Sequence, residues 1–470
     1  MKQVPLNPEG YKLLHDGAIT LARVSNNGIR VDVPYYKTAL LQVSKRIRHL
    51  EKEMHATDVW EEWRKAFGAS SKLTSRQQLA TVLFDKMGFN APGLGDSGNY
   101  KCDSDVLDTI DHPFIDHYMQ AEKLRKLSGT YLQGTLDEVS PDGYLRCFYN
   151  LHLARTYRSS ASNPNIQNQP VRDPLQGRII RRGFIPRDGH RICEIDYSSI
   201  EVRVAACYHK DPAMMRYLTD PTTDMHRDMA AQIFMLEPGD VSKAARHIGK
   251  NSFVFPSFYG DYYVSIARGI WTQMLKSKIT TGSGVPILEH LRSKGITQRG
   301  ACDGETRAQP HTFEHHIQAV ETDFWKRRFQ VYVKWKTDFY DAYIRKGYFT
   351  SLSGMTFSGV MRKNVVINAP VQSAAFHCLL WSLTEIQKEL DNRRMRSVII
   401  GQIHDSCIAD VHEDEMDEYL QIASNVMTVK LKERFPWIGS VPIDVEAEAC
   451  DVGGTWYDKK VIQIPGVSDV

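Results

Sequence analysis

Two aspartates stand where short apolar segments of the chain end. Asp196 closes RICEID (residues 191–196), and Asp405 interrupts IIGQIHDSCIADV (residues 399–411). Two carboxylates that converge from distant segments suit a pair of Mg²⁺ ions, which prefer oxygen ligands and keep substrate phosphates in their shell. Such ions activate an attacking hydroxyl and stabilise a leaving oxygen. Each aspartate alone is better explained as a turn-capping residue, and spacing does not show that the two meet.

A basic helix and a polar loop are further candidates. In KAARHIGKNSFVFPSFYG (residues 243–260), Arg246 and Lys250 share one predicted helix face, with an aromatic residue about two turns on. That face could hold a triphosphate and stack a base, or it could be the solvated edge of an ordinary amphipathic helix. The loop TYRSSASNPNIQNQPVRD (residues 156–173) suits minor-groove contacts, although a plain polar loop explains it as well.

Two smaller groups have a structural and a functional interpretation. Ser198 and Glu201 have the spacing of a capping box. Alternatively, Glu201 on the first helical turn beside Asp196 would crowd a ribose 2′-hydroxyl, and both interpretations can hold together. His311 and His315 are four residues apart and could hold a metal, but a solvated helix face is the favoured interpretation.

Composition limits the class of protein. The 470 residues suggest about three folded units. A net charge of +3 excludes a strongly basic histone-like chain, so any nucleic-acid surface must be a local patch. The eight cysteines lack CxxC spacing and read as reduced thiols of a cytosol-like compartment. With no signal peptide and no 18-residue apolar run, we expect a cytoplasmic protein (the host cytoplasm if viral) without membrane contact.

Hydrophobic periodicity and turn residues predict the elements that position these residues. We expect strand-like segments at 146–154 and 191–196, a strand–turn–strand unit at 397–411, and a short β tail. A turn-rich loop insertion is expected at 276–310. Helices are expected at 40–63, 70–84, 106–136, 224–234 (behind an Asp224 cap), across most of 241–275, and at 313–346 and 413–434. Helical bulk followed by mixed strands and helices indicates an α+β architecture.

Six segments together resemble the family A DNA polymerases, and the bacteriophage replicative members in particular. DYSSIEVR (196–203), RHIGKNSFVFPSFYG (246–260) and HDSCIADV (404–411) resemble motifs A, B and C of that family. NPNIQNQPVRD, TDMHRDMAAQIF and INAPVQSAA resemble three further family segments. Any one match is weak, but six in order are specific.

The resemblance implies a right-hand fold with an antiparallel-sheet palm, helical fingers and a helical thumb. It divides the chain into palm (1–40, 141–235 and 346–470), thumb (41–140) and fingers (236–345, with an insertion at about 276–316). It also implies a template-directed DNA polymerase that extends a primer 3′-hydroxyl with dNTPs and releases pyrophosphate, with two Mg²⁺ ions as cofactors and Mn²⁺ as a possible substitute.

The resemblance also assigns roles to individual residues. The catalytic group is Asp196, Asp405 and Lys250, with Lys250 as a possible proton donor to pyrophosphate. The metal ligands are Asp196, Asp405 and the Tyr197 carbonyl. The dNTP site comprises Arg246, Lys250, Phe255, Tyr259, His226 and Glu201, the last as a gate against ribonucleotides. The primer–template contacts are Arg158, Gln167, Asn368, Gln372 and His404.

Three departures from the family pattern keep alternatives open. The usual glutamate after the catalytic aspartate is Ser406. His-Asp-Ser also occurs in single-subunit RNA polymerases, so an RNA-polymerase or primase-like enzyme remains an alternative, as does a catalytically silent primer–template binding module. A two-metal hydrolase would have no use for the fingers helix. Motif B has one extra residue, so the base-stacking position is Val254 or Phe255. We prefer Phe255, which would imply poor acceptance of dideoxynucleotides.

The third departure is at the N-terminal end. Only about forty residues precede the thumb-like region, so we expect no proofreading exonuclease in this chain. The expected partners are primer–template DNA and dNTPs, with a separate exonuclease, helicase or single-strand-binding protein possible.

Overall fold

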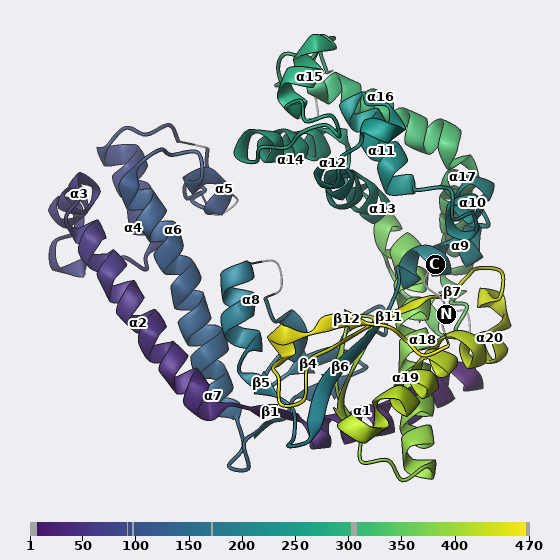
Figure 1. Cartoon of the computed structure of the whole chain (residues 1–470). Helices are drawn as coiled ribbons and strands as arrows, with labels where there is room; N and C mark the ends of the chain where they lie inside the picture. The colour runs from purple at the N-terminus through teal and green to yellow at the C-terminus, as the bar shows by residue number, and fades with distance from the viewer. Residues whose placement is uncertain (1–6, 92, 96–97, 171–172, 302–307, 467–470) are drawn as a thin grey trace.

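The computed structural model describes residues 7–91, 93–95, 98–170, 173–301 and 308–466. Two helical lobes rise from a layer that contains a five-stranded sheet, and together they enclose an open centre (Figure 1). Helices and strands are mixed along the chain, so the expected α+β class is confirmed. No helix in the described part of the chain is long and apolar enough to cross a membrane.

The central sheet is antiparallel throughout, in the order β12-β11-β6-β10-β9. Its strands are β6 (His190–Tyr197), β9 (Val398–Ile403), β10 (Ser406–His412), β11 (Val445–Ala449) and β12 (Lys460–Ile462). Cys193, Ile195 and Tyr197 face the larger core, whereas Glu194 and Asp196 alternate with them on the opposite face. The strands predicted at 191–196 and 397–411 are therefore confirmed.

The larger core lies between the sheet and a long helix. Helix α18 (Lys363–Asn392) contacts β9 and β10 and runs along one side of the sheet, with α1 (Pro8–Asn27) and α19 (Met416–Asn425) packed against it (Figure 1). Gly17 lets α1 approach closely, because a Cβ there would lie 2.5 Å from Leu380 Cγ. Thr20 Oγ1 donates to Thr384 Oγ1 at 3.1 Å. The first residues of the described chain thus belong to the sheet layer.

The first helical lobe has its own core around Trp63 and Phe114. It consists of α2 (Val33–His55), α3 (Asp58–Phe67), α4 (Arg76–Ala80), η2 (Thr81–Lys86), α5 (Ser104–Leu107), α6 (Pro113–Lys126), η3 (Leu127–Gln133) and α7 (Gly134–Glu138). The single helix predicted over 40–63 is wrong, because Thr57 caps a new helix by accepting from Trp60 N–H. The helix predicted over 106–136 is likewise divided, since α6 starts at Pro113 behind a His112 cap.

The second lobe runs from α11 to α17. It consists of α11 (Met225–Phe234), α12 (Lys243–Ile248), η6 (Gly249–Val254), α13 (Phe255–Tyr259), α14 (Tyr263–Lys276), α15 (Ile287–Ser293), α16 (Phe313–Asp323), η7 (Phe324–Arg328) and α17 (Gln330–Lys346). The helix predicted over 313–346 is broken at Phe329, whose buried ring packs on Phe324 and Phe258. The segment 276–310 is not simply a loop, because α15 buries Ile287 and Leu291 in the core.

The remaining elements connect these parts. They are β1 (Ile29–Val31), β2 (Tyr144–Leu145), β3 (Phe148–Asn150), β4 (Ser160–Ser162), η4 (Ile166–Asn168), α8 (Pro174–Arg181), β5 (Phe184–Ile185), α9 (Ile200–His209), α10 (Pro212–Thr219), β7 (Tyr348–Thr350), β8 (Thr356–Ser358) and α20 (Leu431–Arg434). The strand-like segment predicted over 146–154 is realised only as β3, which pairs with β4.

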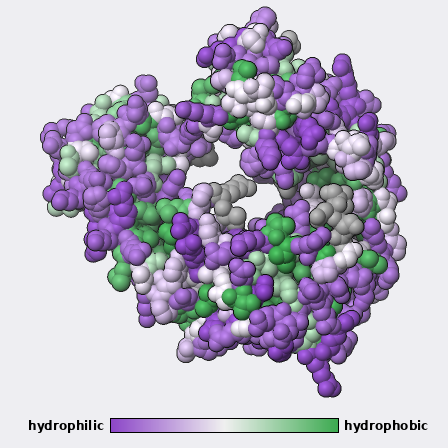
Figure 2. Space-filling model, in the orientation of Figure 1, coloured by the Kyte–Doolittle hydropathy of each residue, from purple (hydrophilic) through white to green (hydrophobic). Residues whose placement is uncertain are grey.

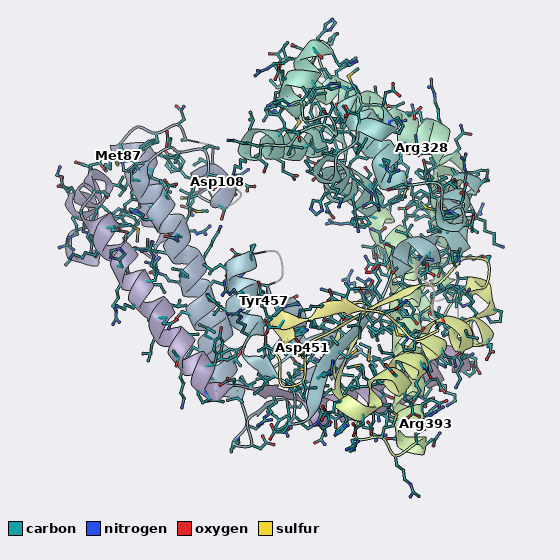
Figure 3. The ribbon with its side chains drawn as sticks, in the orientation of Figure 1. Met87, Asp108, Arg328, Arg393, Asp451 and Tyr457 are labelled. Atoms are coloured by element: carbon teal, nitrogen blue, oxygen red, sulfur yellow. The ribbon has the colours of Figure 1, made fainter. Side chains whose placement is uncertain are left out.

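The two lobes approach each other across the opening. Figure 2 shows a gap through the molecule, much of it bordered by hydrophilic residues. Asp108, labelled at the tip of the first lobe (Figure 3), accepts a hydrogen bond from Lys276 Nζ, at the end of α14, over 2.7 Å. Both side chains are about half exposed, so this ion pair stabilises the contact between the two lobes only slightly.

Candidate active site

The hairpin β9–β10 brings the two predicted aspartates together. Asp196 lies near the end of β6, directly opposite Ser406 of β10. Asp405 occupies the turn between β9 and β10, and its carbonyl oxygen accepts from the Tyr197 N–H at 3.4 Å. Two segments about 200 residues apart thus place their carboxylates side by side because their strands pair.

These carboxylates repel one another in a partly buried position. Burial, followed by the charge of Asp405, raises the pKa of Asp196 to about 8. Burial also raises the pKa of Asp405. Asp196 Oδ1 is buried without a hydrogen-bond partner in the described structure. A divalent cation would satisfy this oxygen and relieve the repulsion.

The donor set fits Mg²⁺ better than a transition metal. Among the described residues, no group of three or more histidine, cysteine, aspartate or glutamate side chains could hold an ion by itself. Mg²⁺ is commonly held by one or two carboxylates that leave positions for waters and substrate phosphates. Asp196 and Asp405 supply such a pair. The Tyr197 side chain is buried, with its hydroxyl 2.9 Å from Ser382 Oγ, so Tyr197 is available only through its backbone.

Helix α9 places Glu201 at the edge of a pocket. The helix starts behind Ser199, which has φ 55° and makes no side-chain cap. The capping box predicted from Ser198 and Glu201 is therefore wrong. Ser198 Oγ instead donates to Glu446 Oε1 at 3.3 Å, and Glu201 forms an ion pair with Arg158.

The pocket beside the aspartates has a volume of about 340 Å³. Its walls combine apolar side chains from the second lobe and from the helices beside the sheet with a few polar groups, a composition typical of a ligand site. Seven of the residues predicted for the site line it, namely Arg158, Glu201, Phe255, Asn368, Gln372, His404 and Asp405. Asn368 and Gln372 come from α18, four residues apart on one face.

Asp224, which the sequence indicated only as a helix cap, partly neutralises the basic face formed by Arg246 and Lys250 on the second lobe. Asp224 Oδ1 caps α11, as predicted, and Asp224 Oδ2 accepts from Arg246 Nε at 2.6 Å. Burial, followed by the charges of Lys250 and Arg246, lowers the pKa of His226 to about 4. His226 is therefore neutral at pH 7 and adds no third positive charge to this face.

A π-helical segment accounts for the extra residue in motif B. Helix α12 continues as the π-helical η6 (Gly249–Val254), and π-bulges accommodate one additional residue within a helix. Val254 is fully buried in the core, whereas the Phe255 ring lines the pocket, with Lys250 Nζ 5.5 Å from the ring centroid. The geometry thus favours Phe255 over Val254 at the base-stacking position. Tyr259 ends α13, and its side chain lies outside the described part of the chain.

A glutamine that sequence reasoning missed supports the turn at Asp405. Gln402 is fully buried and donates from Nε2 to the His404 carbonyl at 2.8 Å. Its Oε1 accepts from Gln167 Nε2 at 2.8 Å and from Ser159 Oγ at 2.6 Å. The predicted DNA-contact residue Gln167 is thereby tied to the hairpin. A polar residue inside an apolar strand was the available signal for this network.

Comparisons with known proteins agree with this arrangement. The model of the family described as DNA polymerase family A matches residues 38–279 and 325–458. The unmatched stretch between these ranges overlaps the insertion expected at about 276–316. The match covers well over half of the chain.

Two bacterial DNA polymerases are among the curated relatives that match this chain. DNA polymerase I of Chloroflexus aurantiacus is 28% identical over 471 residues, covering 97% of this chain and 44% of that protein. The thermostable DNA polymerase I of Thermus thermophilus is 27% identical, covering 94% of this chain and 47% of that protein. The chain thus spans a little under half the length of these relatives.

A solved structure shares the fold. It is described as the POL domain of Pol1 from M. smegmatis in complex with DNA primer-template and dNTP. The likeness has a TM-score of 0.72 at 23% sequence identity, and it covers 94% of this chain and 70% of that one. The right-hand architecture expected from the sequence is therefore confirmed.

Proposed function

This chain belongs to DNA polymerase family A, and from that membership we propose that it extends a DNA primer with dNTPs under the direction of a template strand. The observation that carries the proposal is the meeting of Asp196 and Asp405 beside a pocket between the sheet layer and the second lobe. The reaction is attack of the primer 3′-hydroxyl on the α-phosphorus, with release of pyrophosphate.

The contacts between elements support a division of the chain into three parts. We assign the thumb to residues 41–140 and the palm to 1–40, 141–235 and 346–470. Tyr36, on the second turn of α2, supports the first boundary, because its hydroxyl donates to the Ile180 carbonyl and its ring packs on Phe184. We assign the fingers to 236–345, which begin just after α11, the helix that packs on α12 and η6.

Asp196 and Asp405 would hold Mg²⁺, with the Tyr197 backbone carbonyl nearby. Two bound ions would supply charge that lowers the pKa of the primer hydroxyl and stabilises the leaving oxygen. The protein's own part is to keep one carboxylate near the end of β6 and the other in the turn that leads into β10, so that no reorganisation is needed when the substrate arrives. Mn²⁺ has the same preference for oxygen ligands and is expected to substitute.

The fingers helix would bind the nucleotide. Arg246 and Lys250 provide charge-assisted hydrogen bonds to the triphosphate, and Arg246 must then exchange its bond to Asp224 for one to phosphate. His226, neutral at pH 7, would contribute a hydrogen bond and no charge. Phe255 would stack on the incoming base. Tyr259 completes the set expected for this site.

The palm pocket would hold the primer–template end. Arg158, Asn368 and Gln372 line the space in which the nascent base pair would lie, and Gln167 and His404 flank it. Amide and guanidinium donors suit the acceptors of the minor groove, which are similar for all base pairs. Such contacts would position the duplex without selecting a sequence.

The direct test is extension of a labelled primer–template with Mg²⁺, comparing dNTPs, rNTPs and no nucleotide. Template-dependent extension with dNTPs is expected. Extension with rNTPs in preference to dNTPs would instead establish an RNA-synthesising enzyme, and DNA binding without extension under Mg²⁺ or Mn²⁺ would establish a binding module.

We expect Glu201→Ala to admit ribonucleotides. Removing this side chain from the pocket wall opens space beside the sugar, so the ratio of rNTP to dNTP kcat/KM should rise about 10- to 100-fold, the range that one steric contact provides. The measurement is single-nucleotide incorporation of each rNTP and dNTP. Glu433→Ala, at an exposed position on α20, is the control and should leave the ratio unchanged. An unchanged ratio in Glu201→Ala would remove the gate assignment.

We expect Mg²⁺ binding to weaken as the pH falls below about 8. The raised pKa of Asp196 means that protons compete with the cation, which needs the carboxylate form. Displacement of one proton would raise the apparent Kd for Mg²⁺ by up to about tenfold per pH unit. Calorimetric titration of the complex with a dideoxy-terminated primer, at several pH values, measures this. A Kd that stays constant from about pH 6 to pH 8 would contradict it.

A further inference from the structure

Asp196 has a second carboxylate as its direct neighbour across the sheet. Strand β6 pairs with β10 on one side and with β11 on the other, and Asp196 lies directly between Ser406 and Glu446. Residues directly opposite each other in antiparallel strands project from the same face, with Cβ atoms about 4.5–5.5 Å apart. Glu446 therefore stands beside Asp196, on the face that carries the candidate metal site.

Ser406, on the opposite side of Asp196, cannot supply this charge. It is buried, and its hydroxyl donates to the Ile403 carbonyl at 2.9 Å within the turn. A neutral hydroxyl committed to the turn adds no negative charge for a cation. Of the two neighbours of Asp196 in this row, only Glu446 is ionisable.

The other two glutamates on this face share one buried lysine. Lys459 is only 6% exposed and pairs with both Glu194 and Glu448, the latter at 2.9 Å. Glu194 also accepts from Trp456 Nε1 at 3.0 Å. Each of these two glutamates is therefore held in an ion pair with a buried lysine, which offsets part of their charge.

Glu446 differs from these neighbours. It is exposed, and within the described residues it forms no ion pair. It accepts a hydrogen bond from Ser198 Oγ, two residues beyond Asp196. Burial raises the pKa of Asp196 most strongly, followed by the charges of Asp405 and Glu194, and the charge of Glu446 adds a smaller contribution. The two carboxylates are thus close enough to interact electrostatically.

On the premise that the polymerase function holds, we propose that Glu446 is a positioning residue that strengthens Mg²⁺ binding at Asp196 and Asp405. It acts through a water of the ion's shell, since no three acidic side chains in the described part of the chain are close enough to bind an ion directly. Mg²⁺ dehydrates reluctantly and keeps several waters. A carboxylate in the outer shell accepts hydrogen bonds from those waters, and removal of such a group typically weakens metal binding about 10- to 100-fold.

The test compares E446Q with E448Q. Both changes remove one negative charge by the same substitution, from the same face of β11, two residues apart. Mn²⁺ binding is measured by electron paramagnetic resonance on the complex with a dideoxy-terminated primer–template. The Mg²⁺ dependence of extension is measured in parallel. We expect E446Q to weaken Mn²⁺ binding and to raise the half-saturating Mg²⁺ concentration about tenfold or more, with most of the rate restored at high Mg²⁺. E448Q should match the wild type in both.

Three outcomes would overturn the proposal. They are wild-type Mn²⁺ binding by E446Q, equal weakening in both variants, which would indicate loss of general charge, and a rate deficit in E446Q that no Mg²⁺ concentration restores. Thermal unfolding of both variants checks that the sheet is intact. Absence of extension by the wild type would overturn the proposed polymerase function, whereas the Mn²⁺ titrations would still decide the role of Glu446.

Discussion

Asp405→Asn is expected to lower the rate of primer extension by about 10³-fold or more, which corresponds to roughly 4 kcal/mol of transition-state stabilisation. Asn has nearly the same shape, so the turn between β9 and β10 should persist. It lacks the charge that would hold Mg²⁺ beside Asp196. Gln402 and the Ser406 hydroxyl, which stabilise the same turn, are untouched. Single-turnover extension with saturating dNTP and Mg²⁺ measures the loss.

The control for this variant is Asp451→Asn. Asp451 is exposed beyond the end of β11 (labelled in Figure 3), and its nearest cation, Lys460, is 3.6 Å away at the surface. The control should extend primers at the wild-type rate. Primer–template affinity should be nearly unchanged in both variants, because a negatively charged aspartate does not attract the phosphates of the duplex at either position. Extension by Asp405→Asn within about tenfold of the wild type would show that this aspartate does not hold the metal.

Lys250→Gln is expected to reduce kcat by about 10²-fold or more, the lower end of what a positioned general acid contributes. Lys250 lies one helical turn beyond Arg246, and its Nζ stands over the Phe255 ring at the pocket. It is placed to neutralise the triphosphate and to protonate the departing pyrophosphate. Steady-state and single-turnover kinetics at several dNTP concentrations separate a loss in kcat from a rise in KM.

Lys250→Arg separates charge from proton donation. Arginine keeps the positive charge but is too weak an acid to give up a proton at neutral pH. We expect it to restore the KM for dNTP without restoring kcat. Full recovery of kcat in Lys250→Arg would mean that Lys250 acts only as a cation. Lys243→Gln, at the exposed start of the same helix, is the control for a general loss of charge and should leave both constants unchanged.

Local signals predicted several elements correctly. The cap at Asp224 and the stripe behind it predicted α11, whose bounds are Met225–Phe234. Short apolar segments bounded by a turn predicted the strands around Asp196 and Asp405. These signals succeed because a cap bonds within one turn and a buried strand is apolar over a few consecutive residues, so both can be recognised within a short stretch of sequence.

Predictions failed for local and for distant reasons. The helix predicted over 40–63 is broken by a local cap at Thr57, whereas the helix predicted over 313–346 is broken at Phe329, whose ring joins a buried aromatic cluster. Ser198 has the spacing of a capping residue, but its hydroxyl bonds to Glu446 on another strand. At Phe329 and Ser198 a tertiary contact replaces the structure that periodicity or spacing favours.

The linear order of residues was sufficient to identify the family. Six short segments in a fixed order carry the residues for phosphoryl transfer, and each can be recognised without knowledge of the fold. The linear order also placed Arg246 and Lys250 on one helical turn. Folding was needed to bring Asp196 beside Asp405 and Glu446, to turn Phe255 rather than Val254 toward the pocket, and to pair Arg246 with Asp224. The reason is physical. Strand register and side-chain direction are set by non-local pairing, and a shift of one residue would move each side chain to the other face.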